Sequence, residues 1–238
     1  IENMERCIGG DICREYKLLL QKLGTPVKRT DIGVNCSSFF EAWKDPHGNK
    51  VDWENVQSDS SEFLVRLLNY LDAYYGAFNV RKVSALFGGE LMISHTCNHC
   101  NIAAEPRGTK FITLEIPVQG YDCLEQSLDS FFADSVGEPA YCMYCKQNKP
   151  FTEKTLLDHV NDIIIFDLKR VVYCADEQRC HKIRSEYDFP IDTPLDLWKY
   201  NTKKGIPTYD TLFGDSMRFT LKGIIFHEGP SLTSGHYS

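Results

Sequence analysis

Two short cysteine motifs, CNHC at Cys97–Cys100 and CMYC at Cys142–Cys145, decide most of the fold. A C-x-x-C turn lets two thiolates converge on one ion, and two such turns complete a tetrahedral four-sulfur zinc site, usually on the β-hairpins of a zinc ribbon. The long interval between the motifs leaves room for a hairpin and a helix. Because a four-sulfur site has no open coordination position, the sequence predicts one structural zinc ion, bound by Cys97, Cys100, Cys142 and Cys145.

Two other interpretations of these motifs stay open: a chance coincidence of cysteine pairs, and a redox-active C-x-x-C. His95 lies just before the first motif and His99 within it, and both could act as ligands, but four sulfurs already satisfy the ion. The other cysteines lie outside any C-x-x-C pair, and we expect them to be ordinary core or surface residues: Cys7, Cys13, Cys36, Cys123, Cys174 and Cys180.

The sequence around the cysteine motifs predicts strands, whereas the part before them predicts helices. From about residue 88, β-branched and aromatic residues are enriched in four strand-like runs: ELMISHT (90–96), KFITLEIPV (110–118), DIIIFDLKR (162–170) and RFTLKGIIF (218–226). Helices come first and strands follow, so we predict an α+β fold rather than a βαβ array. The region 193–216 is rich in Pro, Gly, Thr, Asp and Lys, and we interpret it as a long loop or insertion.

Three helices carry start signals in the sequence. Asp11 can cap a helix over DICREYKLLLQKLG (11–24), in which Leu19, Leu20 and Leu23 share a face. Asp59 and Glu62 fit the D-x-x-E capping box, and an apolar stripe follows them: Phe63, Leu64, Leu67, Leu68 and Leu71. Asp122 and Glu125 have the same spacing before a third helix. All three helices are therefore expected to begin at an aspartate cap.

Composition limits the classes of protein that fit. Hydrophobic residues at 42% and charged residues at 25% of a 238-residue chain describe an ordinary globular protein. The net charge of −7 argues against nucleic acid, whose binders carry basic stripes. The chain has no apolar run long enough to span a membrane and no signal-peptide pattern. We therefore expect a cytoplasmic or nuclear protein with reduced cysteines, which favours metal binding or catalysis over a disulfide framework.

The last residues of the sequence, HEGPSLTSGHYS at 227–238, predict a glycine-hinged loop. Gly229 and Gly235 bracket the loop, which delivers His236 and Tyr237. A histidine in this position is a candidate general base.

Four motifs, in order along the chain, resemble those of the ubiquitin-specific proteases, thiol deubiquitinases of the papain-like clan. They are QSDSSEFLVRLL (57–68), the CNHC and CMYC pairs, DIIIFDLKR (162–170) and FTLKGIIFHEGPSLTSGHYS (219–238). The resemblance implies a papain-like fold with thumb, fingers and palm, truncated at both ends. It assigns residues 1–87 to a helical thumb, 88–160 to zinc-ribbon fingers and 161–238 to a palm that holds the histidine box.

The resemblance also implies chemistry, namely thiol-dependent hydrolysis of the bond after ubiquitin's C-terminal glycine. His236 takes the position of the base that accepts the thiol proton. Contact with ubiquitin is implied for five residues: Gln57, Asp59, Glu62, His227 and Tyr237. The expected partners are ubiquitin and ubiquitinated proteins, bound by a monomer.

The sequence departs from this family at the nucleophile. The family's G-N-T-C-Y-x-N-S box is absent, and the GVNCSSFF segment around Cys36 is similar to it only loosely. Cys36 also lies too close to Gln57 to leave room for the family's long helix. We therefore expect the nucleophile to lie outside these residues, and the chain to be inactive alone.

Two other hypotheses stay open. The chain could be a catalytically inactive ubiquitin-binding or scaffold module. It could also be a zinc-ribbon protein unrelated to ubiquitin, in which case the match to the histidine box is a coincidence.

Overall fold

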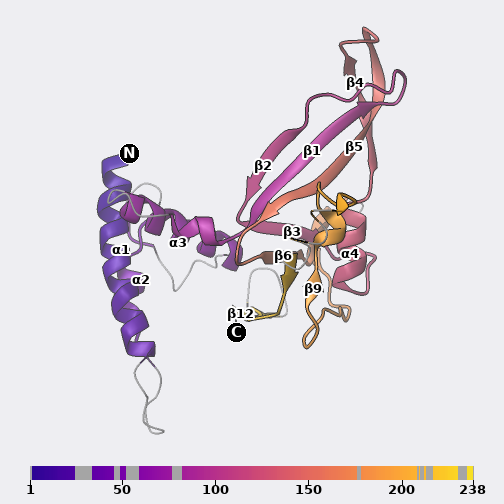
Figure 1. Ribbon diagram of the computed structural model, residues 1–238. Coiled ribbons are helices and arrows are strands. Elements are labelled where there is room, and N and C mark those ends of the chain that lie inside the picture. The colour runs from indigo at the N-terminus through magenta and orange to yellow at the C-terminus, as the bar shows by residue number, and fades with distance from the viewer. Residues whose placement is uncertain are drawn as a thin grey trace. The chain divides into compact units, whose positions relative to one another are not determined.

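The computed structural model describes residues 2–24, 34–45, 49–51, 59–76, 82–175, 178–207, 209, 212, 217–229 and 235–237, and for residues 2–9 only the backbone. The chain divides into two compact units, Ile1–Leu86 and Phe87–Ser238, and each is described by itself. The first is helical and the second consists mainly of strands (Figure 1). The division into thumb, fingers and palm stays a prediction. Among the described helices, none has the length and apolar character needed to cross a bilayer.

The helical unit is built on an aromatic cluster. Its elements are α1 (Glu2–Leu23), α2 (Ser37–Ala42), α3 (Ser60–Gly76) and the 3-10 helix η1 (Val83–Leu86). Trp43 is fully buried after α2 and stacks on Phe63 of α3 with ring centroids 4.5 Å apart. The hydroxyl of Tyr70 donates to the Lys44 carbonyl at 3.2 Å. These contacts fasten the segment after α2 to α3.

The start of α3 confirms the cap predicted at Asp59. Its Oδ1 accepts hydrogen bonds from the backbone N–H groups of Ser61 at 2.8 Å and Glu62 at 3.2 Å. These are donors that the first helical turn leaves without a partner. The predicted apolar stripe faces the core, where Leu67, Leu68 and Leu71 are buried.

The second unit contains a four-stranded antiparallel sheet in the order β2-β1-β5-β4. Its strands are β1 (Gly89–Cys97), β2 (Arg107–Phe111), β4 (Ser135–Cys142) and β5 (Gln147–Val160). It is the long sheet of Figure 1. The outer strand β4 is exposed along its whole length except at Cys142. Packing therefore does little to hold β4 in place.

The core of this unit lies between α4 (Leu124–Phe131) and the parallel pair of β3 (Thr113–Pro117) with β6 (Ile165–Lys169). Its most buried apolar side chains are Leu114, Ile116, Val118, Leu128, Leu157, Leu197 and Met217. The predicted strand 90–96 falls on β1, and 162–170 contains β6. The run 110–118 contains β3 but also the end of β2, because the chain bends at Ile112 and leaves one sheet for the other. The α+β fold class is confirmed.

Part of the predicted loop 193–216 instead belongs to the core. It contains β9 (Leu195–Asp196) and η2 (Trp198–Tyr200), and Leu197 and Tyr200 are buried. The hydroxyl of Tyr200 donates to Asp129 at 2.7 Å. The loop prediction is wrong here because a few widely spaced apolar side chains reach the core from a segment that is polar on average.

Two of the predicted aspartate caps are also wrong. Asp11 lies within α1, which already begins at Glu2, and Asp122 does not cap α4. Cys123 is the N-cap residue of α4 and makes no side-chain cap hydrogen bond. The backbone N–H of Asp122 instead donates to Gln126 Oε1 at 3.0 Å, and that of Leu124 donates to the Asp188 carbonyl at 2.9 Å. The Asp188 carbonyl thus accepts the hydrogen bond at the start of α4 that the side chain of Asp122 was expected to accept.

Three short antiparallel strand pairs complete the described part of the second unit. They are formed by β7 (Val171–Cys174) with β8 (Arg179–Lys182), β9 with β10 (Arg218–Phe219), and β11 (His227–Glu228) with β12 (His236–Tyr237). The predicted strand 218–226 is regular only at its first two residues. Residues 220–226 make no ladder within the described part of the chain, and Ile225 and Phe226 are exposed. A β-prone run becomes a strand only where another strand pairs with it.

Candidate functional site

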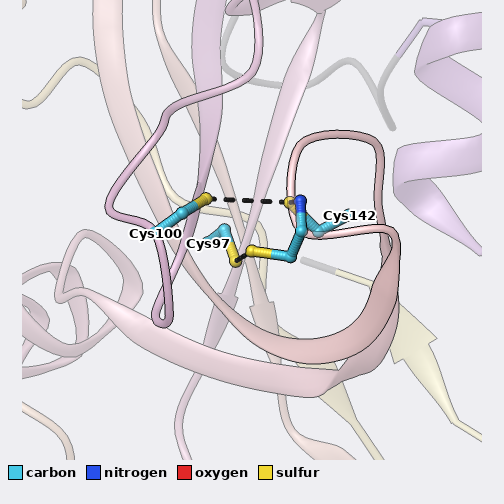
Figure 2. A group of neighbouring side chains, drawn as sticks. Cys97, Cys100 and Cys142 are labelled. Atoms are coloured by element: carbon cyan, nitrogen blue, oxygen red, sulfur yellow. Dashed lines mark hydrogen bonds between the residues drawn. The ribbon is translucent and has the colours of Figure 1, made fainter.

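The four cysteines of the two motifs meet at one end of the four-stranded sheet. Cys97 ends β1 and Cys142 ends β4, while Cys100 and Cys145 follow in the turns. Figure 2 shows Cys100 facing Cys142 beside Cys97. All four sulfur atoms lie within 4.8 Å of one another. Among the described residues, this is the only group of this kind that could hold a metal ion.

The sulfur spacing fits a zinc ion. The Sγ atoms of Cys97 and Cys145 are 3.9 Å apart, and those of Cys100 and Cys142 are 3.8 Å apart. Tetrahedral coordination with Zn–S bonds of about 2.3 Å requires a sulfur–sulfur distance of about 3.8 Å. A disulfide needs about 2.05 Å, so the sulfurs are too far apart for one.

The two cysteine turns have the same backbone geometry. The residue after each second cysteine has a positive φ, 58° at Asn101 and 54° at Lys146. Their N–H groups donate to the carbonyls of Cys97 at 2.8 Å and Cys142 at 2.7 Å. The left-handed backbone conformation is energetically unfavourable for a lysine. Lys146 adopts it because the turn that brings the two thiols together requires this conformation.

The pKa values of two of the four thiols, those of Cys97 and Cys145, are shifted in opposite directions. Hydrogen bonds from the backbone of Cys100 and His99 lower the pKa of the Cys97 thiol to about 6, against an ordinary value of 9.0. Burial and the neighbouring sulfurs raise the pKa of the Cys145 thiol to about 12. One thiolate is therefore stable by itself, whereas four together need a cation. The tetrad suits a divalent metal and poorly suits a neutral ligand.

The histidines near the tetrad do not join it. His95 lies opposite Glu153 in the β1–β5 ladder, and its Nε2 is 2.9 Å from Glu153 Oε2. His99 lies within the first cysteine turn but outside the four-residue cluster.

The candidate base His236 lies on a small hairpin. In the β11–β12 ladder, Glu228 pairs with His236 and His227 pairs with Tyr237. His236 and Tyr237 are exposed, and the rings of Tyr237 and His227 are 5.0 Å apart. Residues 230–234 of the predicted loop lie outside the described part of the chain.

Gly235 is required by close packing within this hairpin. A Cβ at this position would come to 2.5 Å from His227 Nε2 and closer still to the Glu228 carbonyl oxygen. A larger residue would push β11 and β12 apart. The glycine before His236 therefore allows the backbone of β12 to lie against the His227 ring.

His227 itself has a partner that the sequence analysis did not find. The ammonium group of Lys182, the last residue of β8, donates to His227 Nδ1 and to the His227 carbonyl, both at 2.8 Å. A single lysine at the end of a short strand carries no sequence signal for such a contact.

The other predicted contact residues lie in the helical unit. Asp59 and Glu62 are exposed at the start of α3. Gln57 lies outside the described residues.

The cysteines outside the tetrad differ in environment. Burial raises the pKa of the Cys13 thiol to about 11, which makes it a poor nucleophile. Cys36 is the N-cap residue of α2, where Asn35 Oδ1 accepts from the Ser37 N–H at 2.8 Å. Cys123 precedes α4, Cys174 ends β7, and Cys180 lies within β8, where it pairs with Tyr173. The side chain of Cys7 lies outside the described part.

Solved structures identify the fold as that of a ubiquitin-specific protease catalytic domain. One match is described as the SAGA DUB module Ubp8/Sgf11/Sus1/Sgf73 bound to monoubiquitin, with TM-score 0.62, 20% identity, and coverage of 76% of this chain and 40% of that chain. A second structure of that module has TM-score 0.69 and 18% identity, and covers 95% of this chain and 50% of that one. At these identities the likeness concerns the fold alone.

The chain belongs to the ubiquitin carboxyl-terminal hydrolase family, whose model matches residues 3–238. Ubiquitin carboxyl-terminal hydrolase 26 of Oryza sativa subsp. japonica is 30% identical over 194 residues, and the match covers 76% of this chain and 17% of the relative. The hydrolase 26 of Arabidopsis thaliana is 27% identical over 190 residues, with the same coverage. The chain thus spans 17% of the length of these relatives. The family predicted from the four motifs is confirmed.

Proposed function

We propose that this chain is part of a thiol-dependent ubiquitin hydrolase, in which His236 is the general base. The observation that carries the proposal is the family match over residues 3–238, within which the hairpin β11–β12 exposes His236. A free thiol is mostly protonated at neutral pH, so a thiol hydrolase needs such a base beside its cysteine.

In the proposed reaction, His236 takes the proton from the nucleophilic thiol. The thiolate attacks the carbonyl carbon of ubiquitin's C-terminal glycine, and the bond to the substrate amine breaks. The amine leaves with the proton from His236, and ubiquitin remains as a thioester. Water, deprotonated by the same histidine, then releases ubiquitin and restores the thiol.

We place the nucleophile outside these 238 residues. Four of the ten cysteines form the tetrad, and Cys13 is buried with a raised pKa. Cys36, the strongest remaining alternative, lacks the family's cysteine box.

The tetrad would hold one structural zinc ion through Cys97, Cys100, Cys142 and Cys145. Bound there, the ion supplies a cross-link between the two cysteine turns and no reactive position. We also propose that the protein works in a reducing compartment, the cytoplasm or nucleus, where the tetrad thiols would stay available for the metal.

Ubiquitin is the proposed partner. The matched SAGA DUB module is described as bound to monoubiquitin, and this chain shares its fold. Gln57, Asp59 and Glu62 would contact the basic tail of ubiquitin, and His227 and Tyr237 would line the path of that tail. The second candidate, an inactive ubiquitin-binding module, keeps these contacts but lacks the chemistry.

The test uses a fluorogenic substrate attached to the C-terminus of ubiquitin. We expect no turnover by the 238-residue chain or its Cys36→Ala variant, and turnover by the longer protein from the same gene. Turnover by the short chain that Cys36→Ala abolishes would make Cys36 the nucleophile. A longer protein that binds ubiquitin without turnover would instead support the inactive binding module.

Asp59 allows the cap and the proposed tail contact to be separated. Asp59→Ala removes both, and we expect it to lower the free energy of unfolding by about 1 kcal/mol. Asp59→Asn keeps a good cap but removes the charge, so it should leave stability nearly unchanged and weaken ubiquitin binding at low salt. Asp192→Asn, at an exposed position in the second unit, is the charge-matched control. Unchanged ubiquitin affinity of Asp59→Asn at low salt would leave Asp59 with the cap alone.

A further inference from the structure

Lys182 is bound to the hairpin that carries His236 by two hydrogen bonds. Its ammonium group donates to the Nδ1 atom and to the carbonyl oxygen of His227, each at 2.8 Å. Both side chains are half-buried. One side chain thus holds the ring and the backbone of His227 together.

This contact selects one form of the His227 ring. A lysine ammonium group only donates, so Nδ1 must present its lone pair. The ring proton then lies on Nε2, and the ring is neutral. On that side the backbone of Gly235 packs closely, and the Tyr237 ring lies against the imidazole. The orientation of His227 is therefore constrained on three sides.

Lys182 is itself held by the core of the second unit. It lies opposite Val171 at the end of the β7–β8 ladder. The next residue, Ile183, donates its N–H to the Arg170 carbonyl at 2.7 Å, and Arg170 directly follows the core strand β6. The Arg170 guanidinium also donates to the carbonyls of Ile183 at 3.3 Å and Ser185 at 3.0 Å.

The hairpin needs such an anchor. Each of its strands has only two residues, and an isolated two-stranded hairpin is at best marginally stable in water. His236 is exposed and pairs with Glu228, the neighbour of His227. A shift of His227 would therefore change the position of His236.

We propose that Lys182 is a positioning residue for His236, acting through His227 and the β11–β12 ladder. The inference rests on the proposed role of His236 as the base. Displacement of a catalytic group by about 1 Å can cost about 100-fold in rate. Loss of the Lys182 contacts should therefore reduce the chemical step while leaving the rest of the ubiquitin-binding surface in place.

The kinetic test is made in the longer protein with the fluorogenic ubiquitin substrate. Lys182→Met keeps the length of the side chain and removes its donors, and we expect kcat to fall about 10- to 100-fold with KM within about threefold. Lys182→Arg keeps a charged donor and should recover most of kcat.

Lys222→Met, at an exposed position, is the matched control and should behave as the wild type. Zinc content and the thermal unfolding midpoint confirm that each variant is folded.

A second measurement does not depend on activity. Two-bond nitrogen–hydrogen NMR spectra of the 238-residue chain report the tautomer of His227, with its signals assigned by their loss in His227→Gln. We expect the Nε2–H form in the wild type and in Lys182→Arg, and a tautomer mixture in Lys182→Met.

The two measurements separate the inference from the proposed function. An unchanged tautomer in Lys182→Met, or a kcat equal to that of Lys222→Met, would overturn the role of Lys182 alone. A wild-type longer protein without turnover would refute the proposed function and with it the positioning role. The tautomer would then still report whether the Lys182 contact exists.

Discussion

Removal of zinc from the chain is expected to unfold the end of the four-stranded sheet that carries the tetrad. The strand β4 buries only Cys142, so its place depends on the β4–β5 ladder and on the four sulfurs. Structural zinc binding is worth about 10–16 kcal/mol in small zinc-dependent peptides, far more than an exposed outer strand gains from packing. We expect one zinc ion per chain by metal analysis. Amide hydrogen exchange in β4 and the first half of β5 should become fast after chelation.

The same loss is expected from Cys100→Ser combined with Cys145→Ser. The core between α4 and the β3–β6 pair does not include the tetrad, so its amide protection should survive. Cys180→Ser, at an exposed cysteine outside the tetrad, is the control and should retain the metal. A folded wild-type chain purified without metal, with β4 still protected, would refute the zinc assignment.

Replacement of His236 is expected to have the largest effect on activity. In the longer protein, His236→Ala should lower kcat by about 10⁴-fold or more, because the loss of one member of a catalytic set removes nearly the whole effect of that set. KM for the ubiquitin substrate and the zinc content should change little, since His236 is exposed and lies outside the tetrad. Steady-state kinetics with the fluorogenic substrate measure both constants.

An electrophilic ubiquitin probe gives an independent measure of the same role. It alkylates only the thiolate, so its rate should fall with His236→Ala if the histidine deprotonates the nucleophile. His159→Ala, at an exposed histidine of β5, is the matched control and should react as the wild type does. Equal probe rates in His236→Ala and the wild type would exclude His236 as the base.

Features encoded within a few consecutive residues were predictable. The two C-x-x-C motifs predicted the tetrad because each turn brings its own two sulfurs together. The Asp59 cap was predictable because acceptor and donors lie within three residues. The strands β1, β3 and β6 have β-branched and aromatic runs, and each found a partner strand.

Features that depend on a distant partner were not predictable. The cap expected at Asp122 was replaced by the Asp188 backbone, and part of the polar region 193–216 entered the core through Leu197 and Tyr200. The run 218–226 stayed mostly irregular because a strand requires a second strand, which no local pattern specifies. The contact of Lys182 with His227 joins residues 45 positions apart in the chain. Hydrogen bonds and burial across such separations are decided by tertiary packing, because the identity of the partner is not written in the neighbouring residues.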